Sequence, residues 1–182
     1  MKRILKIFLI VIVVVVLAFV VVVALRPADF RVTRSAIIAA PPDAVFAQVN
    51  NLHNWTEWSP WAKLDPDVKN TFEGPASGVG ATFAWAGNNR VGEGRMAITE
   101  SKPNESIQMK LEFLKPIQAV NIMEFTLKPD GDRTVVTWSM FGKNNFMSKA
   151  VSLFMNYDQL IGEQFQKGMT NLNSVLQTAP QK

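Results

Sequence analysis

The chain contains no cysteine and only one histidine, His53, among its 182 residues. The absence of cysteine excludes disulfide bonds, thiolate nucleophiles and cysteine-ligated metals. A zinc or iron site needs two or three histidine, cysteine or carboxylate ligands, and the nearest acids in the sequence are Glu57, Asp65 and Asp67, in an expected loop. We therefore expect His53 to lie at the surface, and the sequence predicts neither a metal site nor a cofactor.

The main part of the chain also lacks an excess of positive charge. The whole sequence has a formal net charge of +4, but six of its 19 basic residues precede residue 35. From Ser35 to the C-terminus there are 13 basic and 14 acidic residues. A domain that binds nucleic acid presents a basic surface to the phosphates, so nucleic acid is not an expected partner.

A recognisable catalytic or phosphate-binding motif is missing as well. The two Gly-x-Gly sequences, at residues 78–80 and 92–94, do not open helices, so we expect strand bends or bulges rather than phosphate loops. Glu93 and Arg95 fall together on one strand face, which the alternation predicts to be the wet face rather than a site of acid–base chemistry. The sequence therefore assigns no catalytic residue and does not identify an enzyme.

A long apolar run near the N-terminus is the most pronounced feature that is present. It extends over 19 residues, from Ile7 to Leu25, with basic residues before and after it. At about 1.5 Å per residue it spans roughly the 30 Å hydrocarbon core of a bilayer. A cleavable signal peptide is the alternative, but its apolar region runs for about 7 to 15 residues and ends at a small-x-small site, which is not found here. We expect residues 1–27 to form an uncleaved anchor that crosses the membrane through residues 7–25.

The charges on the two sides of this run are nearly balanced, so the positive-inside rule gives little indication of topology. The basic residues are Lys2, Arg3 and Lys6 before the run and Arg26, Arg31 and Arg34 after it. A short basic N-terminal stretch is typical of a signal anchor, which favours an N-terminus inside the cell. We expect a single-pass protein of the cell (inner) membrane whose domain lies on the extracytoplasmic side.

Beyond the anchor, short alternating runs are separated by turn residues. The pattern predicts a first strand over residues 30–38 and two short helices, one starting near Asp43 and one over residues 52–58. Six further strands are expected at residues 69–73, 80–86, 92–101, 106–114, 120–128 and 134–141. Because the links between them are short, neighbouring strands can pair only as hairpins, which predicts an antiparallel meander.

The C-terminal part changes to a helical period. From Leu153 to Leu176 apolar residues recur at spacings of three and four, which predicts an amphipathic helix of about 25 residues. A helix with one wide apolar stripe buries that stripe against another element. We therefore expect this helix to cover one face of the sheet.

Several local sequences accompany this order of elements: Ala40–Phe46, Asn54–Trp61, Gly78–Gly80, Trp85–Asn88, Val91–Met96 and Phe165–Leu172. Together, the element order and these stretches resemble the helix-grip fold of the SRPBCC superfamily (START-like, polyketide cyclase/dehydratase type). The resemblance covers roughly residues 30–176. It implies an α+β domain over residues 28–178, in which a curved antiparallel sheet of about seven strands wraps around the long C-terminal helix, and a short tail at residues 179–182.

The superfamily houses lipid carriers, binders of hydrophobic ligands, cyclases and chaperone regulators, so the resemblance alone does not fix the function. It implies an apolar cavity between sheet and helix. The function we expect is a membrane-tethered module that binds a hydrophobic small molecule or lipid there. An interaction or envelope-stress protein with a vestigial cavity and a cyclase- or dehydratase-type enzyme remain open, and the sequence names no protein partner.

The expected ligand contacts are apolar and aromatic side chains. Methionines are typical of adaptable hydrophobic sites, although inward-facing apolar residues also simply fill a core. Three tryptophans recur at every third residue of 55–61, where they form a gate at the cavity mouth, a packed lid, or a contact with the membrane interface. The predicted ligand-binding residues are Trp55, Trp58, Trp61, Trp85, Met96, Met109, Phe113, Met123, Phe125, Trp138, Met140, Phe154, Tyr157 and Ile161.

Overall fold

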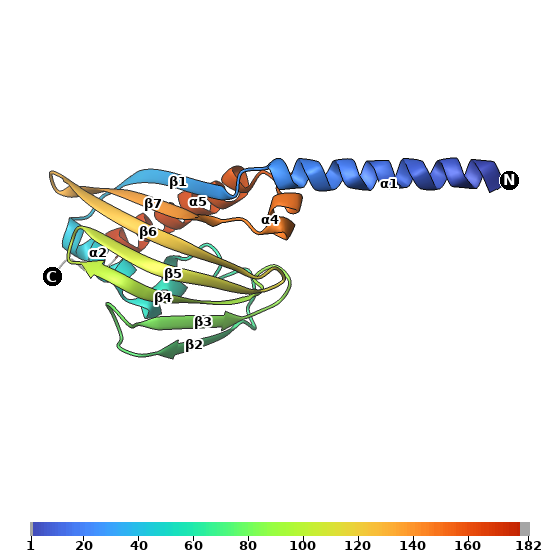
Figure 1. Ribbon diagram of the computed structural model, residues 1–182. Helices are drawn as coiled ribbons and strands as arrows, with labels where there is room; N and C mark the ends of the chain where they lie inside the picture. The colour runs from blue at the N-terminus through green and yellow to red at the C-terminus, as the bar shows by residue number, and fades with distance from the viewer. Residues whose placement is uncertain (1, 179–182) are drawn as a thin grey trace.

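A computed structural model describes residues 2–178 (Figure 1); the tail predicted at residues 179–182 lies outside them. Helix α1 (Lys2–Leu25) projects away from the rest of the chain. Within residues 2–178 it is the one helix that is long and apolar enough to cross a membrane. Its apolar side chains are exposed along its whole length except for Val23 in the last turn.

Seven strands form one antiparallel sheet in the order β1-β7-β6-β5-β4-β3-β2. Strands β2 to β7 follow one another as hairpins, and β1 pairs with the remaining edge of β7. The predicted meander is confirmed. The strands are β1 (Asp29–Ile38), β2 (Lys69–Glu73), β3 (Thr82–Ala86), β4 (Glu93–Lys102), β5 (Ser106–Lys115), β6 (Ala119–Asp130) and β7 (Arg133–Lys143).

The helices lie on one side of the sheet and at its end. After β1 the chain forms α2 (Pro42–Asn50), the 3-10 turn η1 (Leu52–Asn54) and α3 (Trp55–Trp58). Proline at the start of α2 fits the first helical turn, where an N–H group lacks a partner in any case. After β7 come α4 (Phe146–Val151) and the long helix α5 (Tyr157–Thr178), which packs along β1 and α3.

The C-terminal helix begins later than the apolar spacing predicts, at Tyr157 rather than near Leu153. The reason lies in two asparagine caps. The Asn145 side chain accepts a hydrogen bond from the Ser148 amide (2.8 Å) and starts α4, and the Asn156 side chain accepts one from the Gln159 amide (3.2 Å) and starts α5. Each cap satisfies an N–H group that a helix leaves free. The residues between Val151 and Tyr157 belong to no helix, so α5 starts after Asn156, and the separate short helix α4 precedes the predicted stretch.

An aromatic cluster holds α5 against the sheet. Trp138 on β7 stacks on Phe165 of α5, with ring centroids 4.2 Å apart and planes 8° apart. Gly168 permits this approach, because a Cβ atom there would lie 2.7 Å from the Trp138 ring. The two α3 tryptophans, Trp55 and Trp58, pack on the same indole in edge-to-face geometry, an arrangement favoured by the ring quadrupoles.

Candidate functional site

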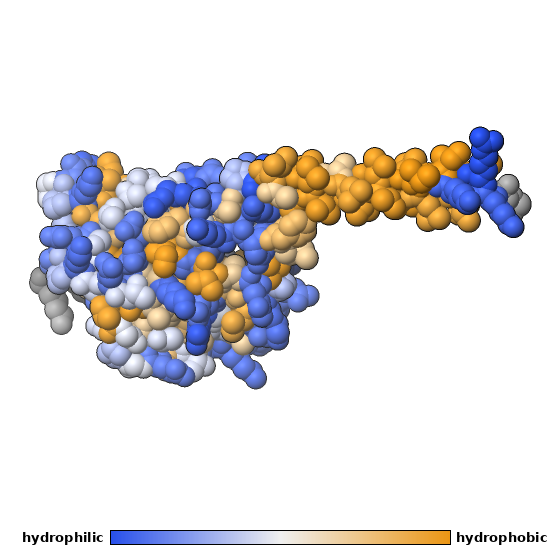
Figure 2. All heavy atoms as spheres, viewed as in Figure 1, coloured by the Kyte–Doolittle hydropathy of each residue, from blue (hydrophilic) through white to orange (hydrophobic). Residues whose placement is uncertain are grey.

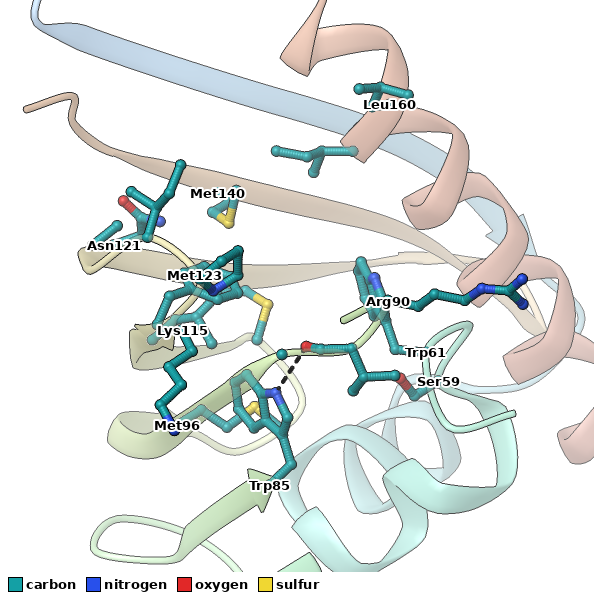
Figure 3. Close-up of a pocket in the computed structure, with 18 of the residues that line it drawn as sticks. Ser59, Trp61, Trp85, Arg90, Met96, Lys115, Asn121, Met123, Met140 and Leu160 are labelled. Atoms are coloured by element: carbon teal, nitrogen blue, oxygen red, sulfur yellow. Dashed lines mark hydrogen bonds between the residues drawn. The ribbon is translucent and has the colours of Figure 1, made fainter. Parts of the chain in front are cut away.

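A cavity of about 460 Å³ lies between the sheet and α5 (Figure 3). Small-molecule sites in proteins usually have volumes of about 300–1,000 Å³ and mainly apolar walls. Here the wall consists largely of inward-facing strand residues and one face of α5. They include Met96, Leu111, Met123 and Met140 from β4, β5, β6 and β7, and Ile161 and Phe165 from α5.

Strand register brings the sulfur-containing side chains together. Met123 lies opposite Met109 on β5 and opposite Met140 on β7, and Met96 lies opposite Leu111. Because side chains alternate between the two faces of a strand, these partners all point to the inner face. The result is a continuous apolar surface whose flexible thioethers can adapt to a ligand.

The mouth of the cavity is formed by the chain segments at one end of the sheet. These are the β3–β4 link around Arg90, the β5–β6 link at residues 115–119, residues 143–144 after β7, and the first turn of α5. Arg90 and Lys115 are exposed, so the cavity reaches the surface here. This is the end from which α1 emerges (Figure 1).

Trp85 fixes the β3–β4 link at this mouth. Its indole Nε1 donates a hydrogen bond to the Val91 carbonyl (3.3 Å, Figure 3). The ring lies across Gly94, where a Cβ atom would collide with it. On the other side of the link, the buried Asp65 carboxylate accepts a hydrogen bond from the Asn88 amide (2.6 Å). These contacts give the mouth a defined shape.

Asn121 is the polar residue that the sequence-based prediction missed. It is only 5% exposed, lines the cavity near its mouth, and its Oδ1 has no hydrogen-bond partner among residues 2–178. The sequence could have predicted its position, because Asn121 lies two residues before Met123 and four before Phe125, and alternate residues of a strand face the same side of the sheet. A buried acceptor without a partner costs about 1–3 kcal/mol. The Oδ1 atom itself is enclosed next to Gly142 of β7. The side chain as a whole lines the cavity, so its amide is a candidate contact for a polar group of a ligand.

Charged groups are confined to the mouth. In the part of the chain that the structure describes, no carboxylate lines the cavity. Lys115 at the mouth is already paired with Glu93 (2.7 Å), and burial raises the pKa of the nearby Tyr157 phenol. Tyr157 therefore stays protonated near neutral pH. Arg95 lies on the solvent-exposed face of the sheet, as predicted, and pairs with Glu112. Arg95 and Lys110 together lower the pKa of the Glu112 carboxyl.

The structure places nine of the fourteen predicted ligand-binding residues on the cavity wall: Trp55, Trp61, Trp85, Met96, Phe113, Met123, Met140, Tyr157 and Ile161. Four others, Trp58, Met109, Phe125 and Trp138, are buried in the core and do not line it. Phe154 is 81% exposed and lies away from the wall, because it precedes α5 and does not follow its apolar stripe.

The tryptophans of residues 55–61 form a packed lid. Trp55 and Trp58 are buried, and the Trp55 indole donates a hydrogen bond to the Val49 carbonyl (2.9 Å). Neither side chain is exposed at the surface. His53 is exposed and stacks on Phe72 with centroids 4.0 Å apart. Across residues 2–178 the structure brings together no group of three potential metal-binding side chains.

Comparison with known proteins agrees with this architecture. The model of the family described as "Polyketide cyclase / dehydrase and lipid transport" matches residues 29–177. No curated protein matches the chain at a significant level.

Solved structures share the fold at low sequence identity. The Aha1 dimer from Colwellia psychrerythraea has a TM-score of 0.59 and 14% identity, covering 84% of this chain and 99% of its own. A protein of unknown function from Staphylococcus aureus has a TM-score of 0.64 and 10% identity, covering 86% and 99%. At such identities these likenesses show the helix-grip fold alone. With its family match over most of its length, the chain belongs to the polyketide cyclase/dehydrase and lipid transport family of the SRPBCC superfamily.

Proposed function

We propose that this protein is a membrane-tethered module that binds a hydrophobic small molecule or a lipid between the sheet and α5. The observation that carries the proposal is the cavity of about 460 Å³ with its methionine-rich wall. The family description, which includes lipid transport, supports a hydrophobic ligand. In this proposal residues 1–27 are the anchor in the cell membrane, and residues 28–178 form the binding domain on its extracytoplasmic side.

The distribution of polar groups favours an amphiphile. Deep in the cavity the wall is apolar, as at Met123, Met140 and Phe165, whereas Asn121 and the exposed Lys143 lie at the mouth end. Burial of apolar surface contributes about 25 cal/mol per Å², so the apolar part of a ligand belongs among the methionines. Its polar end then lies at the mouth.

The wall does not favour the cyclase or dehydratase alternative. Such chemistry needs a group that moves a proton within hydrogen-bond reach of the substrate. The described wall contains no carboxylate or histidine, and the raised pKa of Tyr157 makes its phenol a hydrogen-bond donor rather than a base.

Photo-crosslinking of the full chain in lipid nanodiscs with a diazirine analogue of palmitic acid tests the proposal. We expect crosslinks in the peptides that contain Met123 and Met140, and competition by unlabelled palmitic acid. Ile161→Trp, which fills the cavity, should abolish these crosslinks, whereas Lys167→Trp on the exposed face of α5 should keep them. Crosslinks that are confined to α1 and unchanged by Ile161→Trp would contradict the proposal.

A further inference from the structure

Large apolar side chains are exposed at one end of the domain, on α4 and on the connection between α4 and α5. We call this group the apolar collar. Exposed apolar residues are common singly, but four within ten residues of chain form a candidate contact surface. The collar consists of Phe146, Met147, Phe154 and Met155, which are 49%, 58%, 81% and 47% exposed.

The collar lies beside the last turn of α1. Helix α4 contacts α1, Val23 is fully buried, and Lys149 Nζ lies 3.5 Å from the Ala24 carbonyl oxygen. In Figure 2 the apolar surface of α1 continues onto the domain at the position of α4. Only three residues separate α1 from β1, a link of roughly 10 Å when extended. The domain is therefore held close to the end of its anchor.

This position sets the depth of the collar. If α1 crosses the bilayer with its apolar run in the hydrocarbon core, its last turn lies at the boundary with the headgroups. Helix α4 contacts α1, so the exposed side chains on α4 and just after it lie near the same level. Aromatic and aliphatic residues are favoured in this interfacial layer when their apolar side is buried by about 5–10 Å.

Charge at this end suits a lipid surface. Arg26, Lys143 and Lys149 lie around the base of α1, and Arg31 covers the ring of Phe141 (4.1 Å to its centroid). The acids at this end include the exposed Asp29, opposite Lys143 in the register of β1 and β7. Two others are already paired, Glu93 with Lys115 and Asp158 with Arg34. Basic residues next to a membrane-spanning helix are attracted to anionic headgroups.

The cavity opens at the same end. Tyr157 and Leu160 line its wall, and they follow Phe154 and Met155 closely in the chain, at the start of α5. We propose that the apolar collar docks the domain onto the lipid surface that holds α1, so that the cavity mouth faces the headgroups and takes up its amphiphile from the bilayer rather than from water. This inference rests on the proposed function.

The absence of native cysteine makes a direct test possible with single labelled cysteines in the full chain. Phe154→Cys and Met147→Cys probe the collar, and Asp132→Cys, in the exposed β6–β7 turn at the opposite end, is the control. Each variant carries an NBD dye and is reconstituted into vesicles of phosphatidylcholine with a minor fraction of phosphatidylglycerol. We expect the dye at 154 and 147 to emit at shorter wavelength and to be quenched by nitroxide-labelled lipid, and the dye at 132 to be quenched by aqueous iodide.

Equal access of iodide to positions 154, 147 and 132 would overturn the inference, and would leave the collar as a surface for a protein partner.

Uptake of cis-parinaric acid supplies the second measurement. Replacing Phe154 and Met155 together by serine should slow uptake from vesicles several-fold and leave the equilibrium affinity unchanged. If the dyes at the collar positions are in water but uptake of cis-parinaric acid is normal, the docking is refuted and the proposed binding function is not. If the dyes are in lipid but no variant takes up cis-parinaric acid, the proposed binding function is refuted instead.

Discussion

Replacing Asn121 by leucine should stabilise the empty protein and weaken its binding of an amphiphile. In the structure the Asn121 amide oxygen is buried and has no hydrogen-bond partner among residues 2–178. Leucine has a similar shape, and the adjoining cavity leaves room for its larger methyl groups. Removing an unpaired buried acceptor recovers about 1–3 kcal/mol, which corresponds to roughly 2–4 °C in Tm for each kcal/mol in a chain of this size.

Among residues 2–178, Asn121 carries the one buried side-chain amide that lines the cavity, and the same change removes it as a proposed contact for the polar end of a ligand. A hydrogen bond contributes about 0.5–1.5 kcal/mol, so the affinity for palmitic acid should fall by about 2- to 10-fold. Near-UV circular dichroism of the full chain in detergent gives Tm, and displacement of cis-parinaric acid gives the affinity. Met123→Leu is the matched control, because a volume-conserving change at the next inward position usually costs less than about 1.5 kcal/mol. An Asn121→Leu variant that melts below the wild type, or binds as tightly, would refute this reasoning.

Three further comparisons test the packing and the charges. Gly168→Ala should destabilise the fold by up to about 2 kcal/mol in chemical denaturation, because overpacking against Trp138 (about 1–3 kcal/mol) exceeds the helix-propensity gain of about 1 kcal/mol. The control Thr170→Ala, at an exposed position of the same helix, should not lower the stability. Equal stability of the two variants would argue against a rigid contact between residue 168 and Trp138. Met109→Ala should lower the stability by about 2–5 kcal/mol. Met140→Ala should lower it less, because Met140 borders the cavity and has fewer neighbours to lose. Equal losses of stability would mean that the cavity collapses around the substituted side chain. Hydrogen bonding to Arg34 lowers the pKa of Asp158, so its contribution to stability is present above the unfolded value of about 4 and is lost as pH falls through the lower folded value. Asp158→Asn should therefore flatten the acid side of the Tm profile, and an unchanged profile would mean that the pair contributes nothing.

The sequence predicted the sheet well because each strand has one wet and one buried face. Alternation in residues 106–114, with Ile107, Met109 and Leu111 inward, is a local signal that tertiary packing then exploits. Helix α4 was missed because the apolar spacing used for the prediction begins at Leu153, after α4 has ended. The Asn145 and Asn156 caps mark the starts of α4 and α5, but an asparagine in a sequence does not reveal whether its side chain caps a helix.

The alternation of side chains along the strands also did not distinguish residues that line the cavity from residues packed in the core. Met109 and Met123 face each other on neighbouring strands, yet only Met123 lines the cavity. The difference arises from long-range packing. Trp58, Phe125 and Trp138 fill one part of the space under the sheet with mutually packed rings, and no local pattern states where those rings meet.

The same aromatic cluster determines which way the cavity opens. Trp55, Trp61 and Phe165 form its inner limit, since each lines the cavity and also packs on Trp138. A ligand inserted from the mouth therefore meets fixed rings at depth, and any apolar portion too large for about 460 Å³ must remain outside. In water that remainder would be costly at about 25 cal/mol per Å². If α1 crosses a bilayer as proposed, that part of the ligand can stay in lipid beside the end of α1. The aromatic rings at depth would then favour ligands that are drawn only partly out of the bilayer.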